Sequence, residues 1–413
     1  MTRLWSGGGE LQSTAANIEF TALFTNAPAI ETTTKRSGAA AWRISNAADS
    51  EGWRQLHTSA QGQFFFQFYL YIVALPTLTS TICGASITGA QKVNIRMTSG
   101  GLLQFFNSED SAQVGSDSSA LSTATWYRIA MMYDTTTLAT TSVEARAFVD
   151  TPGASTFWNP SGTIDLAATP TRFGCHTTAG DLTLDYIVDA CGINDTSGTY
   201  QNSWLPDDEH IIVLRPNGNG DESTWTGSDA DSTDNYLLVD EVPPNSTDYV
   251  EENTTNADPA LSRDTYEMDA TPAAMASDAV INWVGVGVYA AVDVTTGGDP
   301  DITLLLRPST GGTVDETGNL DCNSLTFHGP SPLPANDNYS ALGNNSNYEQ
   351  PGTASAWTKA TLDTMQAGMR ESVTDTHFAR VGAVWVMVSY SPAVVGGADG
   401  LTPGKLQPMG IVW

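Results

Sequence analysis

The stretch Ser142–Asp150, SVEARAFVD, alternates between two kinds of side chain with a period of two residues. The small or apolar side chains that would share one face are Val143, Ala145, Ala147 and Val149. The other face would carry Glu144, Arg146 and Phe148. Because successive side chains of a β-strand point to opposite faces, this pattern predicts an antiparallel strand with one buried and one partly solvated face.

Runs of the same character recur along the chain, and Gly, Pro, Asn, Asp and Ser separate them at intervals of roughly ten residues. They include FFFQFYLYIVAL, WYRIAMMYD and LTLDYIVDACGI in the first half, and HIIVLRP, AVINWVGVGVYAAVDV and RVGAVWVMVSYSP in the second. Many short strands with turn residues between them are typical of β-sandwiches and barrels. One stretch, residues 353–373, has apolar side chains close to helical spacing and predicts a helix.

The pattern changes at residues 194–210, NDTSGTYQNSWLPDDEH, which are polar and rich in turn residues. Such a segment is typical of a connection between domains. We therefore predict an all-β protein with two antiparallel β-sandwich (jelly-roll) domains, residues 1–203 and 204–392, followed by a C-terminal arm, residues 393–413. The apolar tip of this arm consists of Ile411, Val412 and Trp413. We expect the tip to be buried against a neighbouring subunit and to act in assembly.

The chain is strongly acidic. Its 413 residues include 46 Asp and Glu but 17 Lys and Arg, which gives a formal net charge of -29 at pH 7. So few basic groups cannot neutralise a phosphate backbone or an anionic membrane, and we expect neither nucleic acid nor membrane as a partner. No apolar run approaches the ~18 residues of a membrane span. The N-terminal residues lack the features of a signal peptide, so we expect synthesis in the cytoplasm.

Four landmarks in the first half occur in a familiar order: TTTKRSGAAAWRIS, FFFQFYLYIVALPT, WYRIAMMYDTTT with SVEARAFVD, and RFGCHTTAGDLTLDYIVDACGINDTSG. Together they resemble a concanavalin A-like (laminin-G-like) jelly-roll domain, in which a Trp-Tyr-Arg strand leads to a strand ending in Asp-Gly. Residues 126–128 match the first motif, and Asp150 matches the Asp of the second, although Thr151 replaces its Gly. Asp185 and Asp189 lie in the strand that closes the domain.

The second half, with LLRPNGNGDESTWTGSD and ARVGAVWVMVSYSP, extends the resemblance to virion proteins of tailed bacteriophages. That resemblance implies a non-enzymatic virion structural protein, namely a capsid decoration, head-fibre or tail-associated component. It implies other virion proteins as partners, release from the host cytoplasm by lysis, and a homo-oligomer for which a trimer is one candidate. The alternative is a carbohydrate-binding adhesin that recognises host-surface glycans.

The carboxylates of the closing strand do not form a catalytic pair in this interpretation. Asp185 and Asp189 would lie on one face about 13 Å apart, which exceeds the separations used by retaining and inverting glycosidases. The Glu-x-Asp-x-(x)-Glu strand of glycosidases built on this jelly roll is absent, as are nucleophile-elbow and phosphate-loop motifs. We therefore predict no catalytic residues and no enzymatic activity, and we interpret these Asp side chains as partners of backbone donors.

Two sets of side chains are candidates for binding. The aromatic residues in or next to polar, turn-rich segments are Trp53, Trp158, Trp204, Trp225 and Tyr339. They suit contact with a glycan or with another subunit, although the first interpretation is that they hold loops onto a sandwich. The oxygen ligands clustered in one loop are Asp229, Asp231 and Asp234. We interpret this segment first as a solvated, turn-rich loop; calcium binding is the alternative, and no other cofactor is expected.

Overall fold

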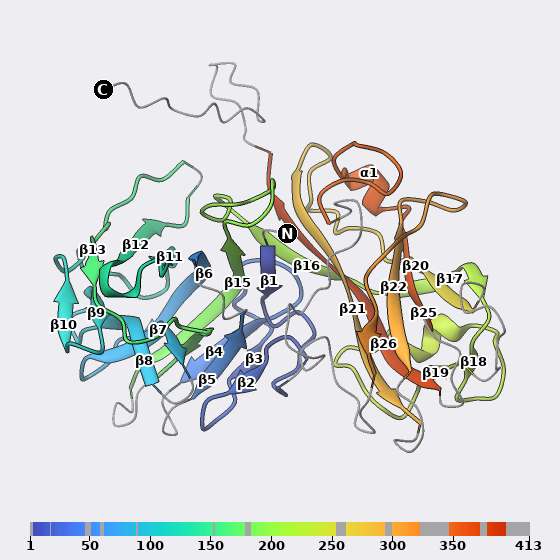
Figure 1. The fold of residues 1–413 in the computed structure, drawn as a ribbon, viewed down its shortest axis with the longest axis horizontal. Coiled ribbons are helices and arrows are strands. Elements are labelled where there is room, and N and C mark those ends of the chain that lie inside the picture. Colours follow the sequence, from blue (N-terminus) through green and yellow to red (C-terminus); the bar gives the residue numbers. More distant parts are fainter. Residues whose placement is uncertain are drawn as a thin grey trace.

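The computed structural model describes residues 3–16, 18–45, 51–57, 62–87, 90–151, 153–177, 183–252, 262–293, 300–322, 347–371 and 378–393. Within them the chain is all-β and forms two antiparallel β-sandwiches that lie side by side (Figure 1). This confirms the predicted fold class. The assembly-arm tip, Ile411, Val412 and Trp413, lies outside the described residues.

The first sandwich consists of an eight-stranded and a seven-stranded sheet. The eight-stranded sheet has the order β13-β12-β11-β6-β15-β4-β3, with β1 paired to β15. Its strands are β1 (Arg3–Gly7), β3 (Ala29–Glu31), β4 (Ala41–Ser45), β6 (Gln63–Ala74), β11 (Trp126–Asp134), β12 (Thr141–Val149), β13 (Ser161–Ile164) and β15 (Asp185–Asp195). The seven-stranded sheet has the order β10-β9-β8-β7-β14-β5-β2. Its strands are β2 (Ala22–Leu23), β5 (Gly52–Leu56), β7 (Ser80–Ile87), β8 (Ala90–Met97), β9 (Leu103–Asn107), β10 (Ala112–Val114) and β14 (Arg172–His176).

The second sandwich consists of a five-stranded and a six-stranded sheet. The five strands are β16 (His210–Leu214), β18 (Thr226–Gly227), β19 (Val250–Glu251), β21 (Val280–Val292) and β26 (Ala379–Ser391). The six strands are β17 (Pro216–Ser223), β20 (Arg263–Met268), β22 (Asp301–Arg307), β23 (Asp315–Glu316), β24 (Leu320–Asp321) and β25 (Gln366–Glu371). The short helical turns are η1 (Leu138–Thr140), η2 (Asn235–Leu238) and α1 (Lys359–Leu362). The predicted boundary after residue 203 falls between β15 and β16.

Strand β12 shows how the alternating sequence sets the layers. Val143, Ala145 and Ala147 are buried between the two sheets, whereas Glu144 and Arg146 are partly exposed on the outer face. The strand pairs with β11 on one side and with β13 on the other. The period-two prediction is therefore confirmed for residues 143–147, whereas Val149 at the strand end is 41% exposed.

The helix predicted at residues 353–373 was wrong. Only α1 is helical there, and the following residues form β25 between β20 and β22. A Cβ atom on Gly368 would lie 2.0 Å from the backbone oxygen of Asp264, so this position belongs to a strand in close contact with its neighbour. Both faces of β25 are largely buried, and it therefore lacks the alternation of polar and apolar side chains that reveals a half-buried strand.

The two sandwiches share a continuous apolar interior. The cluster that contains Trp5, Trp42 and Trp53 of the first sandwich also contains residues of the second, namely Ile211, Trp283, Tyr348, Ala383, Trp385 and Met387. The Arg3 backbone N–H donates to the Tyr348 hydroxyl across this boundary at 2.9 Å. Within the part of the chain that the structure describes, no helix is long and apolar enough to cross a membrane.

Candidate functional site

The connector between the sandwiches, residues 196–209, crosses the outer face of the eight-stranded sheet. Gln67 on β6 donates to the Pro206 carbonyl at 3.1 Å, and the Glu209 backbone N–H donates to the Tyr69 hydroxyl at 3.0 Å. Leu205 packs against Phe65 and Met132 of the same face. The connector therefore covers the part of this sheet on which these side chains lie.

Arg36 holds the end of the connector against the sheet. Its guanidinium forms a bidentate ion pair with Asp150, at 2.7 and 3.1 Å, and also contacts Asp208 and the Glu209 carbonyl. The guanidinium lies 3.5 Å above the ring centre of Tyr69. The Asp150 carboxylate, noted in the sequence for its place at a strand end, thus belongs to the contact between sheet and connector.

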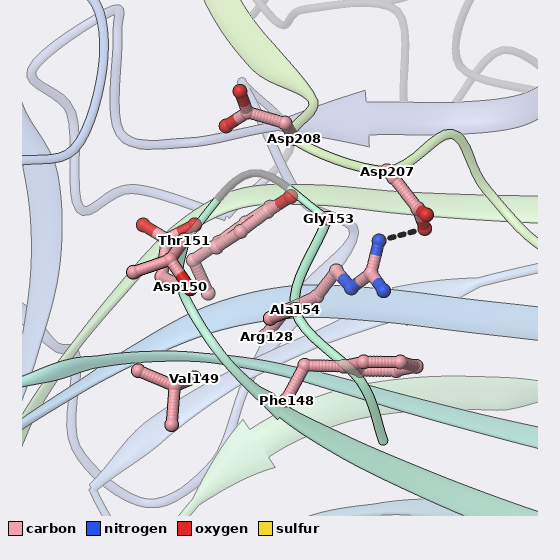
Figure 2. Close-up of a pocket in the computed structure, with 10 residues that line it drawn as sticks. Arg128, Phe148, Val149, Asp150, Thr151, Gly153, Ala154, Asp207 and Asp208 are labelled. Carbon is pink, nitrogen blue, oxygen red and sulfur yellow. Dashed lines mark hydrogen bonds and ion pairs between the residues drawn. The ribbon is translucent and has the colours of Figure 1, made fainter. Parts of the chain in front are cut away.

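A small pocket lies beside this contact, and Figure 2 shows its lining. Arg128 pairs with Asp207 of the connector, and its guanidinium lies 3.8 Å above the ring centre of Phe148. The pocket has a volume of about 20 Å³, which is enough for a water molecule but not for a sugar. We interpret Arg128, Asp207 and Phe148 as part of the contact between sheet and connector rather than as a ligand site.

Buried carboxylates lie beneath the same region. Asp189 is fully buried and accepts backbone N–H groups of Arg36, Ser37 and Ala190 at 2.7, 3.1 and 2.6 Å. Burial raises its pKa to about 6, against the lowering effect of these hydrogen bonds. The sequence interpretation as a partner of backbone donors agrees with these bonds. Its burial follows from the central position of β15, where Ala190 has a φ of 45° at a bulge.

Two further buried carboxylates escaped the sequence analysis. Glu19 accepts the backbone N–H groups of residues 8–11 at 3.0 to 3.2 Å, and burial raises its pKa to about 7. Burial, followed by the charge of Asp189, raises the pKa of Glu10 well above its usual value. The nearest sequence signal is the GGGE segment, residues 7–10, whose residues 8–10 donate backbone N–H groups to the Glu19 carboxylate.

A larger cavity of about 310 Å³ lies between the sandwiches. Its lining comes from both of them and includes Glu10, Gln12, Val213, Arg215, Val242 and Asp269. Arg215 and Asp269 face each other at 3.6 Å, and both side chains are substantially exposed. The lining contains no aromatic ring on which a sugar could stack.

An aromatic pair remains accessible on the face that the connector crosses. Trp126 on β11 lies directly opposite Tyr71 on β6, and both side chains are partly exposed. Their ring centres are 5.3 Å apart with planes inclined at 53°. Val73, two residues further along β6, is 36% exposed. We call Trp126, Tyr71 and Val73 the aromatic platform.

Charged side chains lie beside the platform. Asp185 accepts two hydrogen bonds from the guanidinium of Arg43, at 2.9 and 2.5 Å. Arg43 on β4 is opposite Ile187 on β15, and Ile187 is opposite Tyr71 on β6. Strand β4 is therefore about 10 Å from strand β6, and the three residues share one face of the sheet. The aromatic platform and a fixed pair of donor and acceptor groups therefore lie on the same face of the sheet.

The structure corrects most of the predicted aromatic contacts. Trp53 and Trp225 are completely buried, and Trp158 is 5% exposed, so none of them reaches a glycan or a subunit at the surface. Trp204 is partly exposed, but it packs on the Phe65 ring at 5.2 Å and is covered by the Arg146 guanidinium. These rings are flanked by polar residues in the sequence because they hold loops and strand ends. Tyr339 lies outside the described residues.

The predicted calcium loop is exposed. Asp231 accepts the Thr233 backbone N–H at 2.7 Å, and the Asp229 carboxylate lies 3.4 Å from the Asp231 backbone nitrogen. Asp234 has a φ of 58° and begins η2. Among the described residues, no group of three His, Cys, Asp or Glu side chains is placed to hold a metal ion. As placed, these carboxylates do not form the calcium site predicted from the sequence.

Comparisons with known proteins support the fold. No family model matches the chain, and no curated protein matches it. Among solved structures it is similar to an endo-β-1,4-glucuronan lyase from the fungus Trichoderma reesei, with 9% identity, a TM-score of 0.34, and coverage of 47% of this chain and 95% of the other. It is similar to the PL-14 alginate lyase from Aplysia kurodai, with 12% identity, a TM-score of 0.35, and coverage of 47% and 99%. A Trypanosoma rangeli sialidase mutant has 11% identity, a TM-score of 0.29, and coverage of 47% and 30%.

These proteins are reported as similar structures, and no activity or ligand is assigned to this chain from them. They contradict the prediction that the chain is not an enzyme, because enzymes are among the proteins that it resembles. That prediction relied on the separation expected for Asp185 and Asp189 and on the absence of glycosidase, nucleophile-elbow and phosphate-loop motifs. None of the three is described as a virion component, so the virion assignment stays a prediction from the sequence.

Proposed function

We propose that the protein binds carbohydrate and that a sugar ring stacks on the aromatic platform. The observation that carries this proposal is the partial exposure of Trp126 and Tyr71 on a sheet face that the connector covers only in part. Aromatic rings offer a flat apolar surface, and a carbohydrate offers the matching apolar face of its C–H groups. Burial of these rings by the connector would have been the ordinary outcome.

Polar groups next to the platform suit the hydroxyl groups of a sugar. Arg43 and Asp185 hold each other in a bidentate pair, and the Arg43 side chain is 39% exposed. Glu31 lies 3.6 Å from the same guanidinium. Ligand sites combine apolar walls with a few fixed polar groups, and the platform and this ion pair together have that composition.

The proposal is tested with the full chain on an array of neutral and acidic oligosaccharides, followed by calorimetric titration of any ligand found. Trp126→Ala is expected to weaken binding by about tenfold or more, because the loss of a central aromatic contact costs more than 1 kcal/mol in most interfaces. Any bound polysaccharide is also analysed for cleavage products, which would extend binding to catalysis.

Leu237→Ala is the matched control, since Leu237 is an apolar side chain of the second sandwich that is 52% exposed. It is expected to leave affinity unchanged. Equal affinity of wild type and Trp126→Ala for every ligand, in a variant that melts at the wild-type temperature, would show that the aromatic platform is not the binding site. Absence of any saccharide ligand would contradict the proposed function itself.

A further inference from the structure

The outer face of the seven-stranded sheet carries three arginines with no carboxylate partner among the described residues. They are Arg54, Arg96 and Arg172. Each other arginine of the chain forms an ion pair with an Asp or Glu. In a chain with 46 acidic and 17 basic residues, arginines that gather where no carboxylate reaches them require an explanation. We call these three side chains the arginine face.

The register of the strands places the three side chains on one surface. Gly174 of β14 is opposite Arg54 of β5, and Arg172 is opposite Leu56, so Arg54 and Arg172 are diagonal neighbours about 7 Å apart. Arg96 is on β8, three strands from β5, or about 14 Å across the sheet. Burial lowers the pKa of Arg54, and the positive charge of Arg172 lowers it further. The fold therefore holds like charges together without compensation.

Aromatic rings fix two of the guanidinium groups. Arg96 lies 3.4 Å above the ring centre of Phe106 and donates one hydrogen bond, at 3.2 Å, to an amide oxygen. Arg54 lies 4.5 Å above the ring centre of Phe24 and donates to the Leu23 carbonyl at 2.7 Å. A guanidinium has five N–H donors, so each of these groups is held in place with most of its donors uncommitted among the described residues.

Two glycines and two amide side chains occupy the sheet between these arginines. Gly84 and Gly174 lie in the same row of the sheet, between Arg54 on one side and Asn94 on the other. A Cβ atom on Gly84 would lie 2.8 Å from the side-chain oxygen of Gln91, which therefore extends over the glycine. That oxygen has no hydrogen-bond partner among the described residues. That oxygen and the Asn94 side chain are buried, so the amide groups pack beneath the surface and the guanidinium groups are what a ligand would meet there.

We propose that the arginine face binds a saccharide that carries carboxylate groups. Guanidinium groups bind carboxylates through two parallel hydrogen bonds. The net charge of -29 opposes a nucleic acid with its dense phosphates, and it opposes a second copy of the same chain. A short acidic oligosaccharide presents few charges, and the arginines meet them directly. This site is on the opposite sheet from the aromatic platform and does not depend on it.

The test is calorimetric titration of the full chain with short oligomers of a uronic acid, and with the same oligomers after reduction of their carboxylates to alcohols. The acidic oligomers are expected to bind, more tightly at low salt than at high salt. The reduced oligomers are expected to bind at least about tenfold more weakly, because a hydrogen bond to a charged group contributes roughly 1.5–3 kcal/mol. The double variant Arg54→Gln/Arg172→Gln should show a similar loss.

Arg215→Gln removes one positive charge from the second sandwich, where the side chain is 45% exposed, and it should leave the affinity unchanged. Trp126→Ala should retain binding of the acidic oligomers, so failure of the aromatic platform is distinguishable from failure of this site. Arg96→Gln provides a second loss-of-binding variant if the double variant does not fold. Equal affinity for acidic and reduced oligomers would overturn the proposal. Self-association of the wild type that the double variant abolishes, without saccharide binding, would identify the face as a contact between copies instead.

Discussion

Arg3 and Glu209 form an ion pair of 2.6 Å in which both side chains are fully buried, and it joins the first strand of one sandwich to the entrance of the other. Arg3 also donates to Asn194 and Ser6, each at 2.7 Å. Glu209 accepts a hydrogen bond from Ser389 of β26. Charges removed from water in this way are tolerated only while both partners are present.

Arg3→Met should therefore lower the free energy of unfolding by about 3–5 kcal/mol, because it leaves the Glu209 carboxylate buried without its counter-charge. Denaturant unfolding followed by tryptophan fluorescence measures this. The double variant Arg3→Met/Glu209→Met should recover much of the loss. A single variant as stable as wild type would show that the pair does not hold the sandwiches together.

The stability should also depend on the buried carboxylates at Glu10 and Asp189. Both pKa values are raised above their ordinary values, that of Asp189 to about 6, so the folded chain holds protons that the unfolded chain releases. The stabilising contribution is complete below about pH 4 and is lost as the pH rises through the folded-state pKa values. Thermal melting should therefore show a decrease in stability between mildly acidic and neutral pH from these groups.

Glu10→Gln introduces a neutral side chain that resembles protonated Glu10. It should reduce the loss of stability with rising pH, so that the variant melts at a higher temperature than wild type above neutral pH. Differential scanning calorimetry at a series of pH values measures the effect. Glu267→Gln changes an exposed glutamate of β20 and serves as the control, with no expected change in the slope. A steeper loss of stability with pH in Glu10→Gln than in wild type would contradict the assignment.

Gly368→Ala tests the strand that replaced the predicted helix. The added Cβ would lie 2.0 Å from the Asp264 backbone oxygen, which cannot move without disturbing β20. We expect a loss of about 3 kcal/mol or more. Gly318→Ala meets no heavy atom within 4 Å and should change stability by less than about 1 kcal/mol. Equal effects of the two substitutions in chemical denaturation would argue against the β25 packing.

Arg172→Gln and Arg128→Gln make the same chemical change in opposite environments. Arg172 has no ion pair among the described residues, and its positive charge disfavours the charged form of Arg54. Its substitution should therefore leave the melting temperature unchanged or higher. Arg128 is 6% exposed, pairs with Asp207 and covers Phe148, and its substitution should cost about 1–2 kcal/mol. A larger loss for Arg172→Gln than for Arg128→Gln would show that the arginine face stabilises the fold rather than awaiting a ligand.

The sequence predicted the sandwiches well because their half-buried strands keep the alternation seen in β12. It predicted a helix at residues 353–373 because β25 is buried on both faces and has no alternation to display. Trp53 looked like a surface ring because polar residues flank it, yet strands distant in sequence enclose it completely. Trp126 drew attention only as part of a family motif, since its exposure depends on where the connector crosses the sheet.

The candidate sites were still less accessible to sequence reasoning. Arg54, Arg96 and Arg172 are separated by long stretches of chain, and only the order of β8, β7, β14 and β5 brings them to one face. Their lack of carboxylate partners is a property of three-dimensional pairing. Composition alone predicts that each arginine has a carboxylate partner, because acidic residues outnumber basic ones.

The most direct test of the central claim is a titration of the protein with a saccharide ligand, followed through the indole N–H resonances of its tryptophans. We expect the Trp126 resonance to shift on binding, while those of the buried Trp5, Trp42 and Trp53 stay in place. Resonances are assigned by single Trp→Phe substitutions. A neutral saccharide, which carries no carboxylate for the arginine face, would contradict the proposed platform site if it bound without moving the Trp126 resonance.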